Sequence, residues 1–295
     1  MRQGRMQAAP DLSEKTVLIT GANSGIGKAT AAALASFGAT VILASRDLAK
    51  GQAAADEAST SGKGQIICKQ LDLASFSSIR RFATEVLAEH EQVHVMINNA
   101  GLMLSDRRET EEGFEQTLGI NHIGHFLLTD LLLERIKASA PARIINVSSS
   151  GHAQAGGMDF DDPMSEKNYD GFKVYARSKL ANVLFTQELA ERLAGTGVTV
   201  NSLHPGVVAT GFSKDGDAHG FLATFFKWFA PFLRSPENGA ATSIFLASSP
   251  QVTDITGQYF ADCKAKRVAK GARDVSAQKR LWELTESWVS NASTN

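Results

Sequence analysis

The sequence predicts an α/β fold, in which a single doubly wound parallel sheet carries helices on both faces. Short, almost continuously apolar runs alternate along the chain with longer stretches of helix-forming residues. Strands that are buried on both faces have this kind of sequence. The spacing implies right-handed strand–helix–strand crossovers, which make neighbouring strands parallel and cover both faces of the sheet.

Six apolar runs predict the strands, and a helix-forming stretch follows each of the first five. The predicted strands cover residues 16–20, 40–44, 65–71, 93–97, 143–147 and 198–203. The predicted helices cover residues 26–37, 48–58, 76–89, 111–138 and 174–193. The alternation then breaks, and it resumes as a helix, a strand and a helix over residues 238–247, 257–260 and 275–289.

No linker rich in proline, glycine or serine divides the chain, so we predict one domain over residues 1–295. Within it we expect a core over residues 14–262 and an insertion over residues 205–236. Residues 263–295 are expected to form a helical tail at the carboxyl terminus.

Composition and charge exclude several classes of protein. Hydrophobic residues make up 43% of the chain, which is enough for a large core. The 30 basic and 31 acidic residues leave a net charge of -1, whereas nucleic-acid-binding proteins concentrate positive charge. Cys68 and Cys263 are too few for a disulfide framework or a zinc site. Because no signal-peptide-like run and no stretch long enough to span a membrane is found, we expect a cytoplasmic protein.

A glycine-rich turn follows the first predicted strand, where residues 20–27 read TGANSGIG. Gly21, Gly25 and Gly27 allow positive φ and let a pyrophosphate approach bare backbone. The helix that follows offers free N–H groups and a positive dipole end. The spacing differs from the usual G-x-G-x-x-G fingerprint, so a tight structural turn is the alternative. Its place between the first strand and the first helix is nevertheless the place of a dinucleotide-binding turn.

The end of the second strand predicts which dinucleotide binds. A carboxylate there would favour the ribose hydroxyls of NAD, and an arginine would pair with the 2′-phosphate of NADP. Because Ser45 is neutral and Arg46 is a cation, we predict NADP(H) rather than NAD(H). Alternatively, Arg46 is a solvated surface charge, or Asp47 weakens its attraction for phosphate. Asp72 follows the third strand and either meets the adenine amino group or caps the next helix.

Tyr175 and Lys179 are four residues apart on a predicted helix, so they share one face about 6 Å apart along its axis. An ammonium group about 4 Å from a phenolate attracts it by roughly 4 kcal/mol at an effective dielectric constant of about 20. One pKa unit equals about 1.4 kcal/mol, so we expect the pKa of Tyr175 to be lowered by about two units before desolvation. Such a phenol can protonate a carbonyl oxygen or deprotonate an alcohol.

Other polar residues are predicted at the same carboxyl edge of the sheet, where doubly wound folds bind ligands. Residues 146–150 (NVSSS) end the fifth strand, and one of these serines could bond the reacting oxygen. Residues 98–101 (NNAG) end the fourth strand, and residues 204–210 (HPGVVAT) end the sixth. Asn121 lies in a helical stretch although Asn is a weak helix former, and its alternative role is a bond to its own helix backbone.

Together these motifs resemble the short-chain dehydrogenase/reductase family, and they occur in that family's order over residues 14–262. Residues 178–182 (SKLAN) and 204–208 (HPGVV) are similar to its retinol-dehydrogenase-like branch. The resemblance implies a Rossmann-like fold and an oxidoreductase that moves hydride between nicotinamide and a carbonyl or alcohol carbon. The expected substrate is hydrophobic, such as a retinoid-, steroid- or xenobiotic-like aldehyde, ketone or alcohol.

The resemblance also assigns roles to residues. Tyr175 would be the acid–base group, and Lys179 would lower its pKa and hold the nicotinamide ribose. Ser149, the second serine after Asn-Val, would position the substrate oxygen, and Asn121 would hold a water that links Lys179 to solvent. The implied cofactor-binding residues are Gly21, Asn23, Ser24, Gly25, Ile26, Gly27, Arg46, Asp72, Leu73, Asn98, Ala100, Gly101, Tyr175, Lys179, Pro205, Gly206, Val208 and Thr210.

Two further segments bear on function. Residues 122–125 (HIGH) match a signature of class I aminoacyl-tRNA synthetases, but they lie in mid-chain, and a surface or packing role is preferred to nucleotide or metal binding. Residues 211–232 are markedly aromatic, and we predict that they form an apolar lid over the substrate. Ordinary packing, a subunit contact in a homo-oligomer and weak contact with a membrane surface are the alternatives.

Two alternative functions stay open at this point. The first is a catalytically idle, NADP-binding interaction protein, which turnover of any carbonyl with NADPH would eliminate. The second is a related reductase that acts on a C=C bond.

The extra residues between Ser149 and Tyr175, over 151–171, are expected to form one wall of the pocket.

Overall fold

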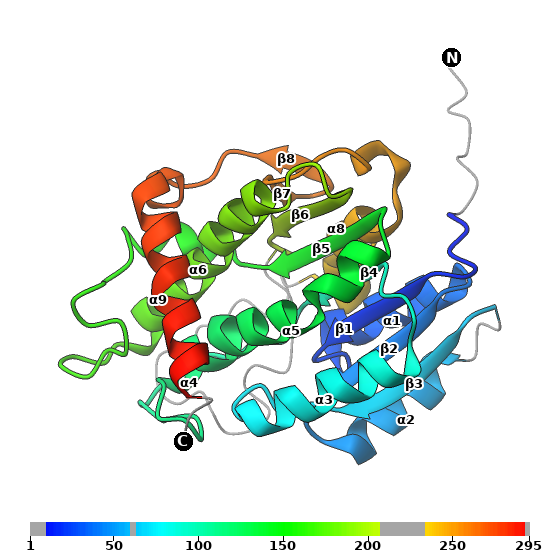
Figure 1. Ribbon diagram of the computed structural model, residues 1–295, viewed down its shortest axis with the longest axis horizontal. Coiled ribbons are helices and arrows are strands. Elements are labelled where there is room, and N and C mark those ends of the chain that lie inside the picture. Colours follow the sequence, from blue (N-terminus) through cyan, green and yellow to red (C-terminus); the bar gives the residue numbers. More distant parts are fainter. Residues whose placement is uncertain (1–9, 60–62, 207–233, 293–295) are drawn as a thin grey trace.

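The computed structural model describes residues 10–59, 63–206 and 234–292. These residues contain eight strands in one sheet, in the order β3-β2-β1-β4-β5-β6-β7-β8. The first seven strands pair in parallel, and β8 pairs antiparallel with β7. The predicted doubly wound α/β fold is confirmed (Figure 1). The strand order changes direction between β1 and β4, where folds of this type bind ligands.

The elements follow the predicted alternation. The strands are β1 (Thr16–Thr20), β2 (Thr40–Ser45), β3 (Gln65–Gln70), β4 (Val95–Asn98), β5 (Ala142–Val147), β6 (Val198–Leu203), β7 (Tyr259–Ala261) and β8 (Lys264–Lys266). The helices are α1 (Gly25–Ser36), α2 (Leu48–Ala58), α3 (Phe76–Glu89), α4 (Gln116–Leu118), α5 (Gly124–Ala138), α6 (Gly171–Arg192), α8 (Pro236–Ser248) and α9 (Val275–Asn291). Shorter turns are η2 (Gly119–Ile123), η3 (Ser150–Gln154), η5 (Pro250–Val252) and η6 (Lys270–Arg273).

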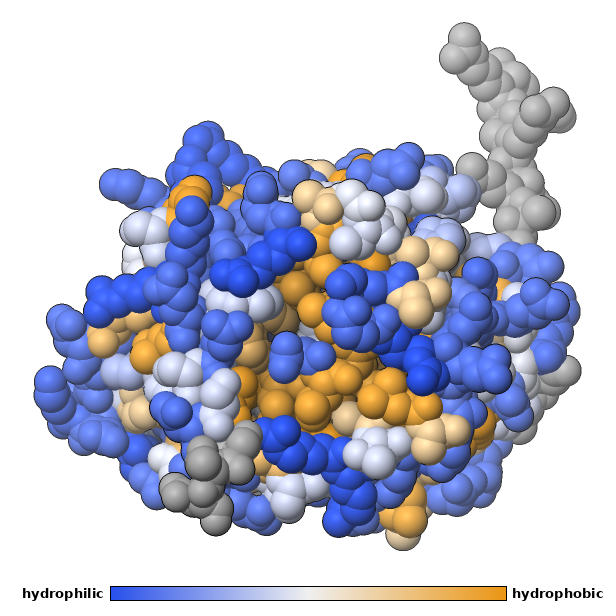
Figure 2. All heavy atoms as spheres, viewed as in Figure 1, coloured by the Kyte–Doolittle hydropathy of each residue, from blue (hydrophilic) through white to orange (hydrophobic). Residues whose placement is uncertain are grey.

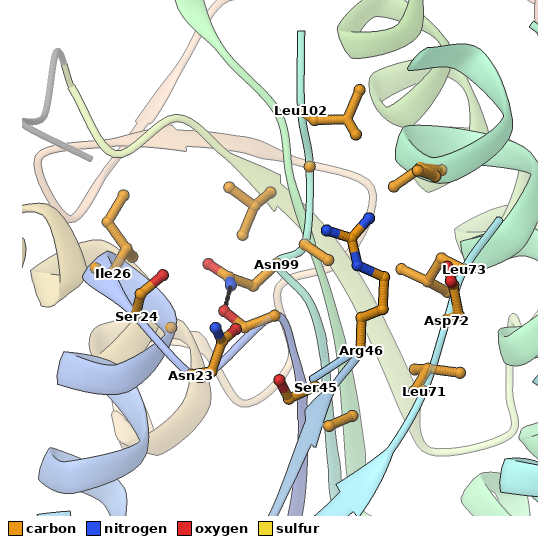
Figure 3. A pocket seen from close by; sticks show the side chains of 18 of the residues that line it. Asn23, Ser24, Ile26, Ser45, Arg46, Leu71, Asp72, Leu73, Asn99 and Leu102 are labelled. Atoms are coloured by element: carbon orange, nitrogen blue, oxygen red, sulfur yellow. Dashed lines mark hydrogen bonds between the residues drawn. The ribbon is translucent and has the colours of Figure 1, made fainter. Parts of the chain in front are cut away.

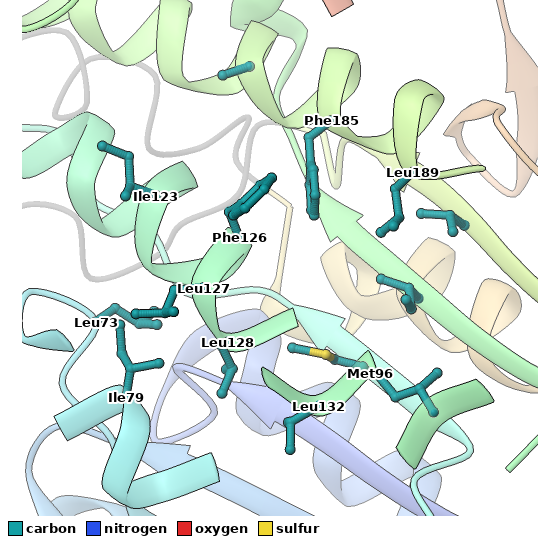
Figure 4. Close-up of a cluster of buried hydrophobic side chains, with 14 of the residues drawn as sticks. Leu73, Ile79, Met96, Ile123, Phe126, Leu127, Leu128, Leu132, Phe185 and Leu189 are labelled. Atoms are coloured by element: carbon teal, nitrogen blue, oxygen red, sulfur yellow. The ribbon is translucent and has the colours of Figure 1, made fainter. Parts of the chain in front are cut away.

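The sheet separates two hydrophobic cores, as its nearly continuous apolar strands require. In β1, Leu18 packs on one side, whereas Val17 and Ile19 pack on the other. Helices α3, α5 and α6 (Figure 4) pack over the first side together with α9, and α1, α2 and α8 pack over the second. Both faces of the sheet are therefore covered by helices.

The helix predicted over residues 111–138 is interrupted. Gly113 has φ +82, and an isolated antiparallel bridge joins Glu109 to Glu115, so no helix starts before Gln116. The carboxylate of Glu115 then accepts hydrogen bonds from the N–H groups of Thr117 and Leu118. After α4 the chain makes the π-helical turn η2 before α5 begins. The side-chain pattern alone did not predict this wide turn.

The carboxyl-terminal region also differs from its prediction. Residues 263–295 were expected to be helical, but they begin with β8, which extends the sheet at its edge before η6 and α9 follow. Among the other predicted elements, β1, α2, α3 and β6 have the predicted bounds, and the rest are present with shifted ends. Most of the predicted insertion, residues 207–233, lies outside the described residues. None of the helices in the described part of the chain is both long and apolar enough to cross a membrane.

The helices on the first side of the sheet bring distant parts of the chain together. In Figure 1, α9 runs beside α6 and past one end of α5. The contact includes Trp282, whose ring lies 4.9 Å from that of Phe126 and 4.1 Å from the guanidinium carbon of Arg192. Figure 2 shows hydrophilic side chains over most of this face and hydrophobic ones gathered in its middle.

Candidate active site

A pocket of about 340 Å³ lies at the carboxyl edge of the sheet, where β1, β2, β4 and β5 end (Figure 3). It lies beside the point between β1 and β4 at which the strand order reverses. The predicted site residues that line it are Gly21, Asn23, Ser24, Gly25, Ile26, Gly27, Arg46, Asp72, Leu73, Ala100, Gly101, Tyr175, Lys179 and Pro205.

The glycine turn lies between β1 and α1 and needs its glycines. Gly21 has φ +63 and Gly25 has φ +52, a backbone region that favours glycine. A Cβ atom on Gly27 would lie 2.6 Å from both Asn99 Nδ2 and Gly21 O. Ser24 precedes α1 without making a side-chain cap bond, so no capping side chain covers the first N–H groups of the helix. This helix start suits a phosphate group.

The two asparagines after β4 have different surroundings. Asn98 is buried, and its Nδ2 donates to Thr129 Oγ1 at 3.1 Å and to Asn146 Oδ1 at 2.8 Å. Asn99 lines the pocket, and its Nδ2 donates to Thr20 O at 2.8 Å. The expectation that Asn98 binds the cofactor is therefore wrong for its side chain, because successive strand residues face opposite sides. Asn99, the next residue, is the asparagine that lines the pocket.

Arg46 follows β2 and extends into the pocket beside Asp72 and Leu73 (Figure 3). The sequence left open that Asp47 weakens the attraction of Arg46 for phosphate. The carboxylate of Asp47 lines the same pocket and caps α2, where Oδ1 accepts from Lys50 N at 3.0 Å and Oδ2 lies 3.8 Å from Lys50 Nζ. Lys50 also lines the pocket. Arg46 and Lys50 thus place two cations at the rim beside the end of β2, where the carboxylates of Asp47 and Asp72 also line the pocket.

Asp72 lines the pocket between β3 and α3, and its two predicted roles can now be separated. Its Oδ1 accepts from Ala74 N at 2.9 Å, which fixes the turn before the helix. Ser75 is the residue that caps α3, because its Oγ accepts from Ser78 N. The capping role is therefore wrong for Asp72, and the adenine contact stays a prediction.

Helix α6 carries Tyr175 and Lys179 to the pocket. Of the three serines after β5, Ser149 is the one that forms a hydrogen bond with Tyr175. Ser148 has a different hydrogen-bond partner, because its Oγ donates to Lys179 O at 2.7 Å. Ser150 is exposed and begins η3. The geometry thus selects Ser149 as the partner of the tyrosine.

The electrostatics of this pair differ from the sequence-based expectation. Burial raises the pKa of Tyr175, and the hydrogen bond from Ser149 lowers it. Lys179 Nζ lies 5.8 Å from the centre of the Tyr175 ring and donates to Val147 O at 3.1 Å. Burial also lowers the pKa of Lys179 to about 8. The expected net lowering of the pKa of Tyr175 is therefore not found, because burial disfavours the phenolate, and it disfavours the ammonium of Lys179 as well.

Asn121 lies in the π-helical turn η2 and does not bond its own helix backbone with its side chain. Its Oδ1 accepts from Leu102 N at 2.8 Å, and its Nδ2 donates to Leu102 O and Ser178 Oγ, each at 2.9 Å. A Cβ atom on Gly101 would lie 3.0 Å from Lys179 Nζ and 3.1 Å from Asn121 Oδ1. The lysine, the asparagine and the bare backbone of Gly101 therefore meet at one point.

The segment after β6 is only partly described. Pro205 lines the pocket, and Gly206 has φ +85 and donates its N–H to His204 Nδ1 at 3.0 Å. Val208 and Thr210 lie outside the described residues. The aromatic segment over residues 211–232 also lies outside them.

The two histidines of the HIGH sequence have a packing role. His122 and His125 are buried, and burial lowers their pKa values to about 4 and about 3. His122 Nε2 lies 3.1 Å from Thr285 Oγ1 of α9. Within the described part of the chain, no group of three or more His, Cys, Asp or Glu residues could hold a metal ion.

Sequence reasoning missed several residues at this site. Apolar side chains that complete the pocket wall are Leu102, Met103, Ile120 and Val147. His152 holds Ser149 in place, because its Nδ1 lies 2.7 Å from Ser149 O and its Nε2 accepts from Ala269 N at 3.3 Å. The sequence offered little signal for His152, since Ala269 is distant in the chain.

The sequence profile of short chain dehydrogenases matches residues 15–219. The chain is 47% identical to retinol dehydrogenase 14 and 48% identical to retinol dehydrogenase 12, both from Homo sapiens. Each match covers 93% of this chain and 86% of the relative. The chain therefore belongs to the short-chain dehydrogenase family, whose members are nicotinamide-dependent oxidoreductases of CH–OH and C=O groups. Within this family it falls in the retinol-dehydrogenase-like branch, as predicted.

Solved structures agree with this assignment. An uncharacterized protein from Mycobacterium paratuberculosis superposes with a TM-score of 0.76 at 35% identity, and the match covers 96% of both chains. A protein from Beutenbergia cavernae, described as an NAD(P)-dependent gluconate 5-dehydrogenase with bound NADP, superposes with a TM-score of 0.68 at 29% identity. That match covers 86% of this chain and 97% of the other.

Proposed function

We propose that this enzyme uses NADP(H) in preference to NAD(H) and that its substrate is a bulky hydrophobic alcohol, aldehyde or ketone. The observation that carries the cofactor preference is Arg46 at the end of β2, next to a pocket rim that also contains Lys50. The neighbouring Asp47 carboxylate is used to cap α2. A guanidinium group pairs strongly with a phosphate, and the 2′-phosphate is the group that distinguishes NADP from NAD.

A dinucleotide fits the residues that are present. The uncapped start of α1 suits a pyrophosphate, and Gly21, Gly25 and Gly27 line the pocket beside it. Gly101 and Lys179 line the catalytic end of the pocket, and a Cβ atom on Gly101 would lie 3.0 Å from Lys179 Nζ. When bound, the cofactor supplies the hydride donor or acceptor, and the protein holds the reactants and handles the proton.

The proposed proton chemistry uses Tyr175. During carbonyl reduction, its hydroxyl proton moves to the substrate oxygen as hydride adds to the carbonyl carbon, and a phenolate remains. Ser149 bonds Tyr175 and positions the same oxygen, and the Lys179 ammonium stabilises the phenolate that burial disfavours. Asn121 lies next to Lys179 and would hold the water that returns a proton from solvent.

The apolar wall of the pocket supports a hydrophobic substrate. Leu102, Met103, Ile120 and Val147 lie on the same pocket as Tyr175. The named relatives are retinol dehydrogenases, whose substrate is a bulky lipophilic alcohol. The lid over residues 211–232 remains a prediction within this proposal.

A panel of aldehydes, ketones and secondary alcohols tests the proposal, with NADPH absorbance followed for each. We expect kcat/KM to rise with the length of the apolar substituent and to be higher with NADPH than with NADH. Equal values for short and long aldehydes would contradict the substrate class. Analysis of the products separates reduction of C=O from reduction of C=C.

The Arg46→Asp variant tests the cofactor preference directly. Loss of a charge-assisted bond costs about 1.5–3 kcal/mol, which corresponds to about a 10-fold to 100-fold rise in KM for NADPH. The KM for NADH should change by less than about 3-fold. Arg81→Asp, at an exposed position on α3, is the matched control and should leave both values unchanged. Similar rises for both cofactors would overturn the assignment.

A further inference from the structure

His125 joins two parts of the active site that are distant in the sequence. It is buried in α5, and both of its ring nitrogens have polar partners. Nε2 lies 2.8 Å from Thr20 Oγ1, and Nδ1 lies 3.2 Å from Asn121 O. Thr20 begins the glycine turn, and Asn121 lies in the π-helical turn beside Lys179.

The hydrogen bonds of Thr20 determine whether Nε2 of His125 carries a proton. Thr20 Oγ1 accepts hydrogen bonds from Asn99 N and from Ala100 N, each at 3.0 Å. A hydroxyl group has two acceptor lone pairs and one donor proton, so both lone pairs are occupied. Its only proton must then point to His125 Nε2, which accepts it and is unprotonated.

The other ring nitrogen must carry the proton. A backbone carbonyl can only accept, so Nδ1–H donates to Asn121 O. The opposite tautomer would place a third donor on Thr20 Oγ1 and turn a lone pair of Nδ1 toward the carbonyl. Burial lowers the pKa of His125 to about 3, so the ring stays neutral over the working pH range. His125 is thereby fixed as the neutral Nδ1–H form.

Both bonds act on backbone that shapes the site. Through Thr20, His125 is linked to the N–H groups of Asn99 and Ala100, and a Cβ atom on Gly21 would lie 2.9 Å from Ala100. The glycine turn and the end of β4 are thus held in close contact. Through the carbonyl of Asn121, His125 is linked to the turn whose side-chain bonds hold Leu102.

We propose that His125 is a positioning residue that holds the glycine turn and the Asn121 turn in a fixed arrangement, with one ring nitrogen bonded to each. It does not touch the reacting atoms and acts through Thr20 and Asn121. The inference rests on the roles proposed above for the glycine turn and for Asn121. It predicts that the two bonds affect different steps, because one supports cofactor binding and the other supports proton transfer.

Three substitutions separate the two bonds. His125→Gln can place its amide oxygen near the Nε2 position, so it keeps a partner for Thr20 and loses the bond to Asn121. We expect kcat to fall by about 10-fold or more while the Kd of NADPH changes by less than about 2-fold. His125→Asn can place its amide N–H near the Nδ1 position, and we expect the Kd to rise more than kcat falls. His125→Phe loses both bonds, and kcat/KM should fall by about 100-fold.

His122→Phe is the matched control, since His122 is equally buried and three residues away but bonds Thr285 of α9. It should lower the thermal midpoint and leave kcat and the NADPH Kd within about 2-fold. A purely structural role for His125 would make its variants behave like this control. That result, or an equal loss of kcat and affinity in the Gln and Asn variants, would overturn the proposal.

A measurement on the unmodified protein covers the case in which the variants do not fold. In histidine-¹⁵N-labelled enzyme at pH 7, the imidazole spectrum should show His125 as neutral with its proton on Nδ1. An Nε2–H tautomer or an imidazolium would overturn the proposal. Because this measurement needs no turnover, failure of the proposed substrate class remains distinguishable from failure of the inference about His125.

Discussion

At the scale of single residues, one step along β4 decides whether an asparagine serves the pocket or the interior. Asn99 holds the glycine turn, whereas Asn98 begins a buried chain of polar side chains that continues through Asn146 to Thr186 Oγ1, with each bond 2.9 Å or shorter. Buried polar groups are costly unless they are paired, and here the amide N–H groups of Asn98 and Asn146 find partners inside the protein, whereas Asn98 Oδ1 has none among the described residues. The same environment raises the pKa of Tyr175 and lowers that of Lys179.

Replacing Tyr175 tests the assigned acid–base group. Tyr175→Phe removes the hydroxyl, and loss of general acid catalysis is expected to lower kcat/KM by about 10²-fold to 10⁴-fold. The Kd of NADPH, measured by fluorescence titration, should change by less than about 2-fold. Tyr169→Phe is the control, since that hydroxyl bonds Leu104 O and Glu115 instead. Turnover by Tyr175→Phe within about tenfold of the wild type would exclude the assignment.

Replacing Lys179 should abolish turnover and raise the free energy of unfolding. Its pKa is about 8 in the folded protein and 10.5 as a free side chain, so between these values the unfolded chain binds the proton more readily. Below about pH 8 the buried ammonium therefore costs stability, and above 10.5 the cost is absent. At pH 7, Lys179→Met should raise the free energy of unfolding by about 2 kcal/mol, after subtracting the lost hydrogen bond to Val147 O, while turnover is lost. Urea unfolding measures this, and no gain relative to Lys173→Met, at an exposed site, would contradict it.

At the scale of elements, α6 and η2 place the catalytic groups, and the sequence predicted only one of them well. The spacing of Tyr175 and Lys179 predicted a helix, and α6 carries both residues. The helix predicted over residues 111–138 gave no sign of the π-helical turn that holds Asn121. Such turns depend on tertiary contacts, here the bonds from Asn121 to Leu102 and Ser178, rather than on helix propensity.

The start of α6 provides a test at this scale. Asp170 caps the helix, because its Oδ1 accepts from Phe172 N at 3.0 Å and from Lys173 N at 3.1 Å. Asp170→Ala should lower the free energy of unfolding by about 1 kcal/mol. Asp161→Ala, an exposed position in the same segment before α6, should change it by less than about 0.5 kcal/mol. Equal losses in denaturant titrations of the two variants would show that the cap bonds do not support the helix.

At the scale of the whole molecule, the fold buries neutral histidines on both sides of the site. Burial lowers the pKa of each of the six histidines in the described part of the chain, to about 4 for His122 and about 3 for His125. The unfolded chain would bind protons at these positions near pH 6.5. Folding is therefore opposed by protonation as the pH falls below that value. Burial raises the pKa of Glu115, which acts in the opposite direction.

The resulting prediction is loss of stability at mildly acidic pH. The contribution of His122 and His125 is complete above pH 6.5 and decreases as the pH falls toward about 4. Each of the two should cost about 2 kcal/mol between pH 7 and pH 5. Urea titrations at both pH values measure the total, and His122→Phe should remove about 2 kcal/mol of the loss. A free energy of unfolding that is the same at pH 5 and pH 7 would contradict the prediction.

Local sequence signals determined the alternation of strands and helices, the glycine turn, the place of Arg46 after β2 and the Tyr175–Lys179 pair. These features depend on hydrophobic periodicity, turn chemistry and helical spacing, which act over a few residues. The fold class and the family were therefore correct from the sequence, together with most of the residues that line the pocket.

The tertiary structure alone decided which polar side chains meet. Asn99, and not the predicted Asn98, has its side chain at the glycine turn. Ser149 is the serine that bonds Tyr175, and His125 lies between Thr20 and Asn121. The tertiary structure also reversed the expected direction of the tyrosine's pKa, because the free-energy cost of burying a charge depends on every group packed around it. Such contacts join residues from distant parts of the chain, and no local pattern specifies them.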